Sequence, residues 1–322
     1  TRSLSQLLNH RLDLNYDQIY RYMVNGYKSI YKHNCSFYNQ VQQVNRGQLI
    51  KINKDLKLTK KVYWKPELKI NEKLSYNESV DKIREKLHKS VAIRLRSDVP
   101  IAFCMSGGVD SNALISMAVH QNKFDVHAFT VSVVDKRYNE DELVNKAVKD
   151  LKISHTSIKI EKKNFLDDLK TLVNSHDCPV STISYFFHWK MLKEISEAGF
   201  KVSISGTGAD ELFTGYYDHG NLFLKTVHDN SENFNIELEG FKKNHLPYVR
   251  NEFLKDPFLF INNPDFRAHI YDDSKLYHQF LNKDWKENFS EKNYHPSLLR
   301  NRMLNEMFHE IIPVILHEDD LN

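Results

Sequence analysis

Residues 100–114 read PIAFCMSGGVDSNAL and carry the strongest chemical signal in the chain. The apolar run from Ile101 to Met105 has the length and character of a buried central strand of a parallel sheet. The hexapeptide SGGVDS follows, and apolar residues return at helical spacing from Leu114. A strand, a glycine turn and a helix start direct backbone N–H groups at an anion. The sequence therefore predicts a phosphate-binding loop at residues 106–111.

Asp110 lies inside this predicted loop. A carboxylate does not bind phosphate directly, but it is a ligand that Mg²⁺ prefers. The alternative is a simple glycine turn with a capping aspartate. No GK[ST] follows the glycines, so the stretch is not a Walker loop. We therefore expect a site for a nucleotide with Mg²⁺.

SGGVDS resembles the pyrophosphate loop of the ATP pyrophosphatases, in which the loop holds the β- and γ-phosphates of an ATP cleaved to AMP and pyrophosphate. GMP synthetase, NAD synthetase, argininosuccinate synthetase, tRNA thiolases and asparagine synthetase share this loop. The resemblance implies adenylation of a substrate without naming the product.

A second stretch, SGTGADELFTGY at residues 205–216, follows another predicted strand. It fails as a dinucleotide-binding fingerprint because Glu211 stands where a third small residue is needed. It resembles instead the second signature of asparagine synthetases, SGEGADELFGGY. With two loops of one family about a hundred residues apart, the chain is identified as a member of the asparagine synthetase superfamily.

Composition limits the other classes of function. The 322 residues suffice for one large domain or two, and 45 basic against 42 acidic residues argue against a dedicated nucleic-acid binder. Cys35, Cys104 and Cys178 form no C-x-x-C pair, which fits a reducing compartment and weakens a thiolase or structural zinc site. No transmembrane run or signal peptide is visible, so we expect a cytoplasmic protein without membrane contact.

The hydrophobic pattern predicts an α/β protein with a doubly wound parallel sheet, a fold of the adenine nucleotide alpha hydrolase type, and a helical C-terminal part. The predicted strands cover residues 101–105, 125–134, 155–160 and 201–205. The predicted helices that alternate with them cover residues 79–96, 140–151, 164–175 and 186–198. Aromatic residues between 217 and 289 are interpreted as helix packing.

The first part of the chain reads as helices up to residue 31, followed by a hairpin with strands at 48–53 and 55–59 that ends in Tyr63 and Trp64. This part resembles the junction between the glutaminase and synthetase domains of glutamine-dependent asparagine synthetases. We expect residues 1–66 to be such a junction and 67–322 a synthetase domain. The expected partners are a small-molecule carboxylate acceptor and a glutaminase domain or subunit outside this chain that supplies ammonia. Formation of a homodimer is a further option that the sequence does not decide.

The resemblance implies site residues position by position, with ATP and Mg²⁺ as cofactors. The loop would hold the phosphates of ATP through Ser106, Gly107, Gly108, Asp110 and Ser111. Backbone groups would frame the adenosine at Cys104, Val131, Ser205 and Gly206. Asp110 and Asp210 would hold Mg²⁺, although Asp210 has the alternative of capping a helix at Glu211. The acceptor carboxylate would bind near Asp177, Thr182 and Ser184.

Two departures from the family pattern bear on the product. Thr207 replaces the glutamate of SGEGADE, and Glu318 aligns with the lysine of the family's LxKxD motif. Both positions normally touch the reacting centre, so Thr207 and Glu318 join Asp110 and Asp210 in the predicted catalytic set. One hypothesis is that Glu318 supplies the base that Thr207 cannot, and the alternative is that Glu318 is a solvated helix residue.

The predicted reaction is ATP-dependent amide formation, with asparagine synthesis from aspartate and ammonia or glutamine as the leading interpretation. A relative that amidates another carboxylate, such as a uronic acid in a surface polysaccharide, is the second. A non-catalytic ATP-binding remnant is the third.

Overall fold

The computed structural model describes residues 2–66, 73–133, 135, 138–160, 163–230, 233–271 and 274–322. They form two compact units. The sheet unit contains residues 64–207 and 319–322, and the helical unit contains residues 1–63 and 208–318. One division of the chain follows Tyr63, and residues 208–318 belong to the same unit as residues 1–63, whereas the predicted second domain runs continuously from 67 to 322; the predicted domains stay predictions.

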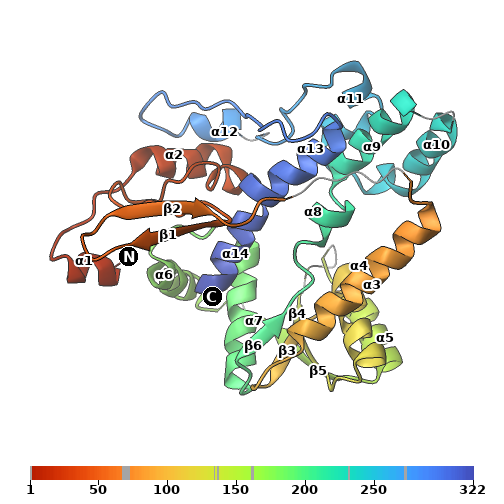
Figure 1. The fold of residues 1–322 in the computed structure, drawn as a ribbon, viewed down its shortest axis with the longest axis horizontal. Coiled ribbons are helices and arrows are strands. Elements are labelled where there is room, and N and C mark those ends of the chain that lie inside the picture. The colour runs from red at the N-terminus through yellow and green to blue at the C-terminus, as the bar shows by residue number, and fades with distance from the viewer. Residues whose placement is uncertain are drawn as a thin grey trace. The chain divides into compact units, whose positions relative to one another are not determined.

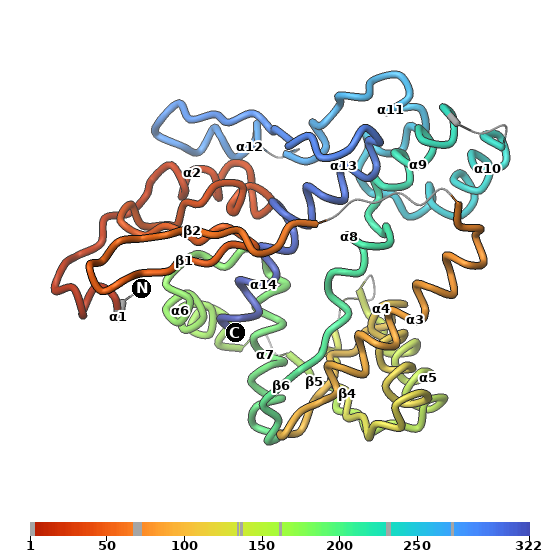
Figure 2. Tube along the Cα trace, in the orientation of Figure 1, coloured from red at the N-terminus to blue at the C-terminus, as the bar shows by residue number. Residues whose placement is uncertain are grey.

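The sheet unit is built on four parallel strands in the order β5-β4-β3-β6 (Figure 1). These strands are β3 (Ile101–Cys104), β4 (His127–Ser132), β5 (Ser154–Lys159) and β6 (Val202–Ile204). Each lies inside or within one residue of its predicted range. The central strand β3 is apolar throughout, as expected for a buried parallel strand, whereas in β5 only Ile158 is aliphatic. The trace in Figure 2 shows helices between successive strands.

Helices cover both faces of this sheet, as alternate residues of β3 show. Phe103 packs in one core cluster with Ile115 of the helix that follows β3, while Ala102 packs in another with Met191. The doubly wound parallel sheet is therefore confirmed. The helices of this unit are α3 (Tyr76–Arg94), α4 (Val109–Ser116) with its π-helical extension η2 (Met117–Gln121), α5 (Asp141–Leu151), α6 (Phe165–His176) and α7 (Ile183–Glu197).

The helical unit contains a two-stranded hairpin, β1 (Gln48–Ile52) and β2 (Leu58–Val62), together with helices from both ends of the chain. The α-helices are α1 (Arg2–Leu7), α2 (Tyr16–Asn25), α8 (Ala209–Phe213), α9 (Tyr217–Asn230), α10 (Phe234–Asn244), α11 (Leu259–Asn262), α12 (Ser274–His278), α13 (Leu298–Asn305) and α14 (Ile312–Leu321), the last of which continues into the sheet unit. The shorter helical segments are η1 (Tyr27–Ser29), η3 (Leu246–Tyr248), η4 (Glu252–Lys255) and the π-helical η5 (Glu306–Glu310).

The hairpin turn is longer than predicted, and its second strand begins at Leu58 rather than at Asp55. The side-chain oxygen of Asn53 accepts hydrogen bonds from the backbone N–H groups of Asp55 and Lys57, at 3.1 and 2.8 Å. These bonds compete with strand pairing. Leu56 adopts a φ of 60°, so the chain turns over residues 53–57 before pairing resumes.

The predicted packing role of the aromatic residues after residue 217 is confirmed by two clusters that involve α9. Leu222 packs with Phe260, and Leu224 packs with Phe241. Phe260 is only 1% exposed. Among the described residues, no helix is both long and apolar enough to span a membrane.

A fully buried arginine lies in the helical unit among four carboxylates. The guanidinium of Arg302 pairs with the side chains of Asp218, Glu291, Glu306 and Glu310. Burial alone would lower the pKa of Arg302, but the carboxylates of Glu310, Glu306 and Asp218 raise it well above its usual value. Arg302 therefore stays charged and balances part of the negative charge around it.

We expect Arg302→Ala to lower the free energy of unfolding by about 3–5 kcal/mol, because it leaves buried carboxylates without their cation. The control is Arg84→Ala, which removes an exposed i,i+3 pair with Asp81 and should cost less than about 1 kcal/mol. Urea unfolding followed by circular dichroism measures both. A loss below about 1 kcal/mol for Arg302→Ala would show that this cluster does not stabilise the unit.

Candidate active site

A cavity of about 320 Å³ opens at the carboxyl ends of β3, β4 and β6 in the sheet unit. It is lined by most of the residues predicted to bind ATP and by two of the predicted catalytic residues, Asp110 and Thr207. The predicted residues that line it are Cys104, Ser106, Gly108, Asp110, Ser111, Val131, Ser205, Gly206 and Thr207. Residues about a hundred positions apart in the sequence thus meet at one edge of the sheet. Crevices at this edge are where open parallel α/β sheets bind their ligands.

The loop at 106–111 is shaped by its own serines. Ser106 N–H donates to Ser111 Oγ at 3.2 Å, and Gly108 N–H donates to Ser106 Oγ at 3.1 Å. Asn112, which the sequence analysis missed, donates from its amide group to the carbonyl oxygens of Ser106 and Gly108 at 2.9 and 2.7 Å. The loop therefore closes over the first turn of α4, where helix N–H groups favour an anion.

The second signature touches this loop through Gly206. A Cβ atom at Gly206 would lie 2.7 Å from the backbone nitrogen of Ser111 and 3.0 Å from the carbonyl carbon of Asp110. Such distances are too short for any side chain, so glycine is required where the end of β6 meets the phosphate loop. The cradle thus joins backbone donors and the Asp110 carboxylate, the groups that a nucleotide phosphate and Mg²⁺ need.

Two acidic residues in the connection from β4 to α5 also line the cavity. The carboxylate of Glu140 accepts a hydrogen bond from the Gly107 N–H at 2.8 Å. Asp141 accepts from Ser132 Oγ at 2.7 Å, and hydrogen bonds from Ser132 and Asn139 lower its pKa. The sequence analysis missed both, although they stand at the start of the predicted helix 140–151, in the connection that leaves the ligand edge of a parallel sheet.

Cys104 lies at the end of β3 on the predicted adenosine side of the cavity. Burial raises the pKa of its thiol to about 11, although a hydrogen bond with Ser203 acts in the opposite direction. The thiol is therefore protonated near neutral pH and is a poor nucleophile. The expected contact of its backbone with adenosine stays a prediction.

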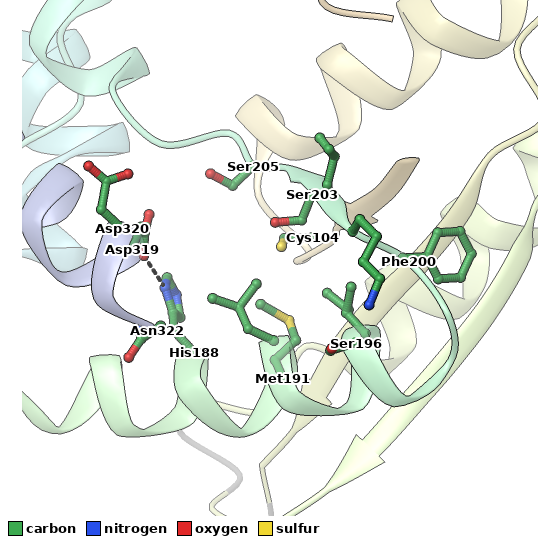
Figure 3. Close-up of a pocket in the computed structure, with 14 residues that line it drawn as sticks. Cys104, His188, Met191, Ser196, Phe200, Ser203, Ser205, Asp319, Asp320 and Asn322 are labelled. Carbon is green, nitrogen blue, oxygen red and sulfur yellow. Dashed lines mark hydrogen bonds and ion pairs between the residues drawn. The ribbon is translucent and has the colours of Figure 1, made fainter. Parts of the chain in front are cut away.

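A second cavity of about 400 Å³ adjoins the first and shares Cys104, His188, Met191 and Ser205 with it. It extends between α7 and β6, with His188 projecting from α7 toward Asp319 (Figure 3). His188 Nδ1 and Asp319 Oδ1 are 3.4 Å apart. Apolar side chains and charged groups both line this cavity.

The predicted acceptor residues lie in neither cavity. Asp177 is the residue that ends α6, with a φ of 54°, and Thr182 directly precedes α7. Ser184 is exposed in the first turn of α7. The structure therefore does not bring Asp177, Thr182 and Ser184 to the cavity that holds the signature loops, and their role stays a prediction.

Asp210 and Glu318 belong to the helical unit, so their place relative to the cavity stays a prediction. The alternative interpretations of both residues are wrong. Gly208 is the residue that precedes α8, so Asp210 lies inside the first turn and does not cap the helix. Glu318 has no solvent exposure, so it is not a solvated residue on the surface of α14.

The comparisons with known proteins agree with the two loops. Residues 82–313 match the family model described as asparagine synthase. Asparagine synthetase [glutamine-hydrolyzing] 1 from Bacillus subtilis is 28% identical over 176 residues, which are 55% of this chain and 27% of the relative. Putative asparagine synthetase [glutamine-hydrolyzing] 2 from Methanocaldococcus jannaschii is 28% identical over 221 residues, covering 66% of this chain and 41% of the relative.

Among solved structures, NH3-dependent NAD synthetase from Campylobacter jejuni aligns with a TM-score of 0.32 and 17% identity over 62% of this chain and 93% of that one. The two curated relatives are matched over less than half of their own length. The family model, in contrast, covers most of this chain, including both signature loops. The chain belongs to the asparagine synthase family.

Proposed function

We propose that this chain is the synthetase part of an ATP-dependent, amide-forming ligase that works through an acyl-adenylate. The observation that carries the proposal is the single cavity at the carboxyl edge of the sheet, where both signature loops supply lining residues. Synthesis of asparagine from aspartate is the leading candidate, because the family and the similar relatives carry that name.

The proposed reaction needs ATP because oxide is too poor a leaving group for ammonia to displace it from a carboxylate directly. Ammonia cannot expel oxide, so a carboxylate oxygen of the acceptor first attacks the α-phosphorus of ATP. The bond from that phosphorus to the bridging oxygen breaks, and pyrophosphate leaves. Ammonia then attacks the acyl carbon, the carbon–oxygen bond to AMP breaks, and the nitrogen loses a proton to give the amide. Water must be excluded, because it would hydrolyse the adenylate.

The residues of the cavity divide this work. Backbone N–H groups at the start of α4, with the hydroxyls of Ser106 and Ser111, would bind the pyrophosphate portion and stabilise its departing charge. Asp110 would hold Mg²⁺, which neutralises phosphate charge when bound, and Asp210, a residue of the helical unit, is proposed as a second ligand of that ion. The ends of β3, β4 and β6 would frame the adenosine with backbone groups.

Thr207 supports a second candidate, amidation of a different carboxylate such as a uronic acid. Its hydroxyl accepts a hydrogen bond from Ser205 Oγ at 3.0 Å, so a neutral group lines the cavity where the family has a glutamate. A base for the attacking ammonia must then come from another side chain. That Glu318 supplies this base stays a hypothesis, and the structure adds that its side chain is buried.

We expect Asp110→Asn to weaken the binding of Mg·ATP by more than about tenfold, because a charged ligand of the metal is lost. Isothermal titration calorimetry with Mg·ATP measures the change. Asp125→Asn is the matched control, since it removes the same charge from an exposed residue of the sheet unit outside the cavity. Equal affinities of Asp110→Asn and the wild type would refute the site assignment.

The acceptor is tested by exchange of radiolabelled pyrophosphate into ATP in the presence of single carboxylates. We expect exchange that depends on aspartate and is lost in Asp110→Asn, because adenylation is reversible before ammonia is added. Exchange with glucuronate or galacturonate but not aspartate would favour the second candidate. Exchange with none of a broad panel of carboxylates would favour a non-catalytic ATP-binding protein.

A further inference from the structure

Three ligand-type side chains lie close together inside the helical unit. Oxygen atoms of Asp218 and Glu306 and a nitrogen of His219 lie within 4.8 Å of one another, a spacing that could suit a metal ion. The hydrogen bonds exclude that role for His219. Its Nδ1 accepts from the Gly215 N–H at 3.2 Å, so its proton is on Nε2, which lies 2.7 Å from Glu306 Oε2. Both ring nitrogens are engaged, and Arg302 pairs with both carboxylates.

The histidine instead links a buried charge cluster to an exposed loop. His219 is 2% exposed and Glu306 is fully buried, whereas Gly215 lies at the surface directly after α8. Glu306 is held in turn by Arg302. A buried histidine that donates to a paired carboxylate has one fixed tautomer and one orientation. Its Nδ1 lone pair therefore offers the Gly215 N–H a fixed acceptor.

A second hydrogen bond braces the same loop. Tyr216 Oη donates to Glu211 Oε1 at 2.6 Å, and Glu211 is 2% exposed in α8. Two neighbouring residues of the loop are thus held by two different buried side chains: Gly215 by His219, and Tyr216 by Glu211. Two such bonds reduce the freedom of a loop that otherwise lies in solvent.

Gly215 determines where the carboxylate of Asp210 can lie. A Cβ atom built on Gly215 would be 1.6 Å from Asp210 Oδ1 and 2.5 Å from its carboxyl carbon. The carboxylate therefore rests directly against the glycine backbone, in the space that any other residue would fill. A displacement of Gly215 changes the position available to Asp210.

We propose that His219 is a positioning residue for Asp210: its Nδ1 fixes the Gly215 backbone, and Gly215 in turn fixes the carboxylate that would hold the divalent cation of Mg·ATP. This inference rests on the proposed function, which gives Asp210 its role toward the metal. His219 lies outside the signature at 205–216, and it would act on the site through its Nδ1, which accepts the hydrogen bond from the Gly215 N–H.

Two substitutions separate the two hydrogen bonds of His219. Asparagine places a side-chain oxygen near the former Nδ1 and can still accept from Gly215, but it does not reach Glu306. Glutamine places its amide near the former Nε2 and can still donate to Glu306, but it offers no acceptor to Gly215. Each variant loses one hydrogen bond. His219→Asn loses the buried bond to the Glu306 carboxylate and should lower the melting temperature more than His219→Gln, which loses the bond to the exposed Gly215.

We expect His219→Gln to weaken the binding of Mn²⁺ with ATP by about tenfold and His219→Asn to weaken it less than about threefold. Electron paramagnetic resonance of Mn²⁺ measures this binding without requiring turnover, and calorimetry with Mg·ATP repeats it. His228→Gln and His228→Asn, on the exposed side of α9, are the matched controls and should leave both constants unchanged. Gly215→Ala, at an exposed residue, places a methyl group in the space of the Asp210 carboxylate and should weaken Mn·ATP binding by at least about tenfold.

Asp110→Asn and Asp210→Asn complete the experiment. Equal effects of His219→Gln and His219→Asn on Mn·ATP binding, or a larger effect of His219→Asn that follows its larger loss of melting temperature, would overturn the inference and leave His219 a structural residue. Normal Mn·ATP binding by Asp210→Asn alone would overturn it as well, while Asp110→Asn still supported the proposed function. Normal binding by both aspartate variants would refute the proposed function itself.

Discussion

The parallel pairing of β3 with β4 on one side and β6 on the other is the constraint on which the site depends. Ala102 of β3 is in register with His127 of β4 and with Ser203 of β6. Since parallel strands end at the same edge, the loops that follow β3 and β6 must meet there. The two loops meet at Gly206, which packs so closely against the backbone of Ser111 that no side chain would fit there.

Charge is handled differently in the two units. In the sheet unit, Asp110, Glu140 and Asp141 line a cavity open to solvent, where a divalent cation and a polyphosphate could balance each other. In the helical unit, the carboxylates around Arg302 are buried and are balanced within the protein. Asp210 lies in α8, next to the exposed Gly215, whose backbone N–H donates to His219 of the buried cluster.

Local patterns in the sequence determined the parallel sheet, its four strands and the two loops of the cavity. Each is a short-range feature: an apolar run such as Ile101–Cys104 favours burial, and the glycine at 206 allows close approach to the backbone of the phosphate loop. The resemblance to the family, rather than these patterns, singled out Cys104, Val131, Ser205 and Thr207, and all four line the cavity. The acceptor residues were a looser inference, and Asp177, Thr182 and Ser184 lie outside both cavities.

Only the tertiary structure decided which polar side chains support the site. The sequence near Glu140 does not reveal that its carboxylate binds the Gly107 N–H, and nothing around His219 shows that Gly215 and Glu306 occupy its two nitrogens. The burial of Glu318 and of Arg302 likewise follows from packing. The physical reason is that a sequence fixes backbone preferences over a few residues, whereas hydrogen bonds and burial depend on partners that are distant along the chain and meet only after folding.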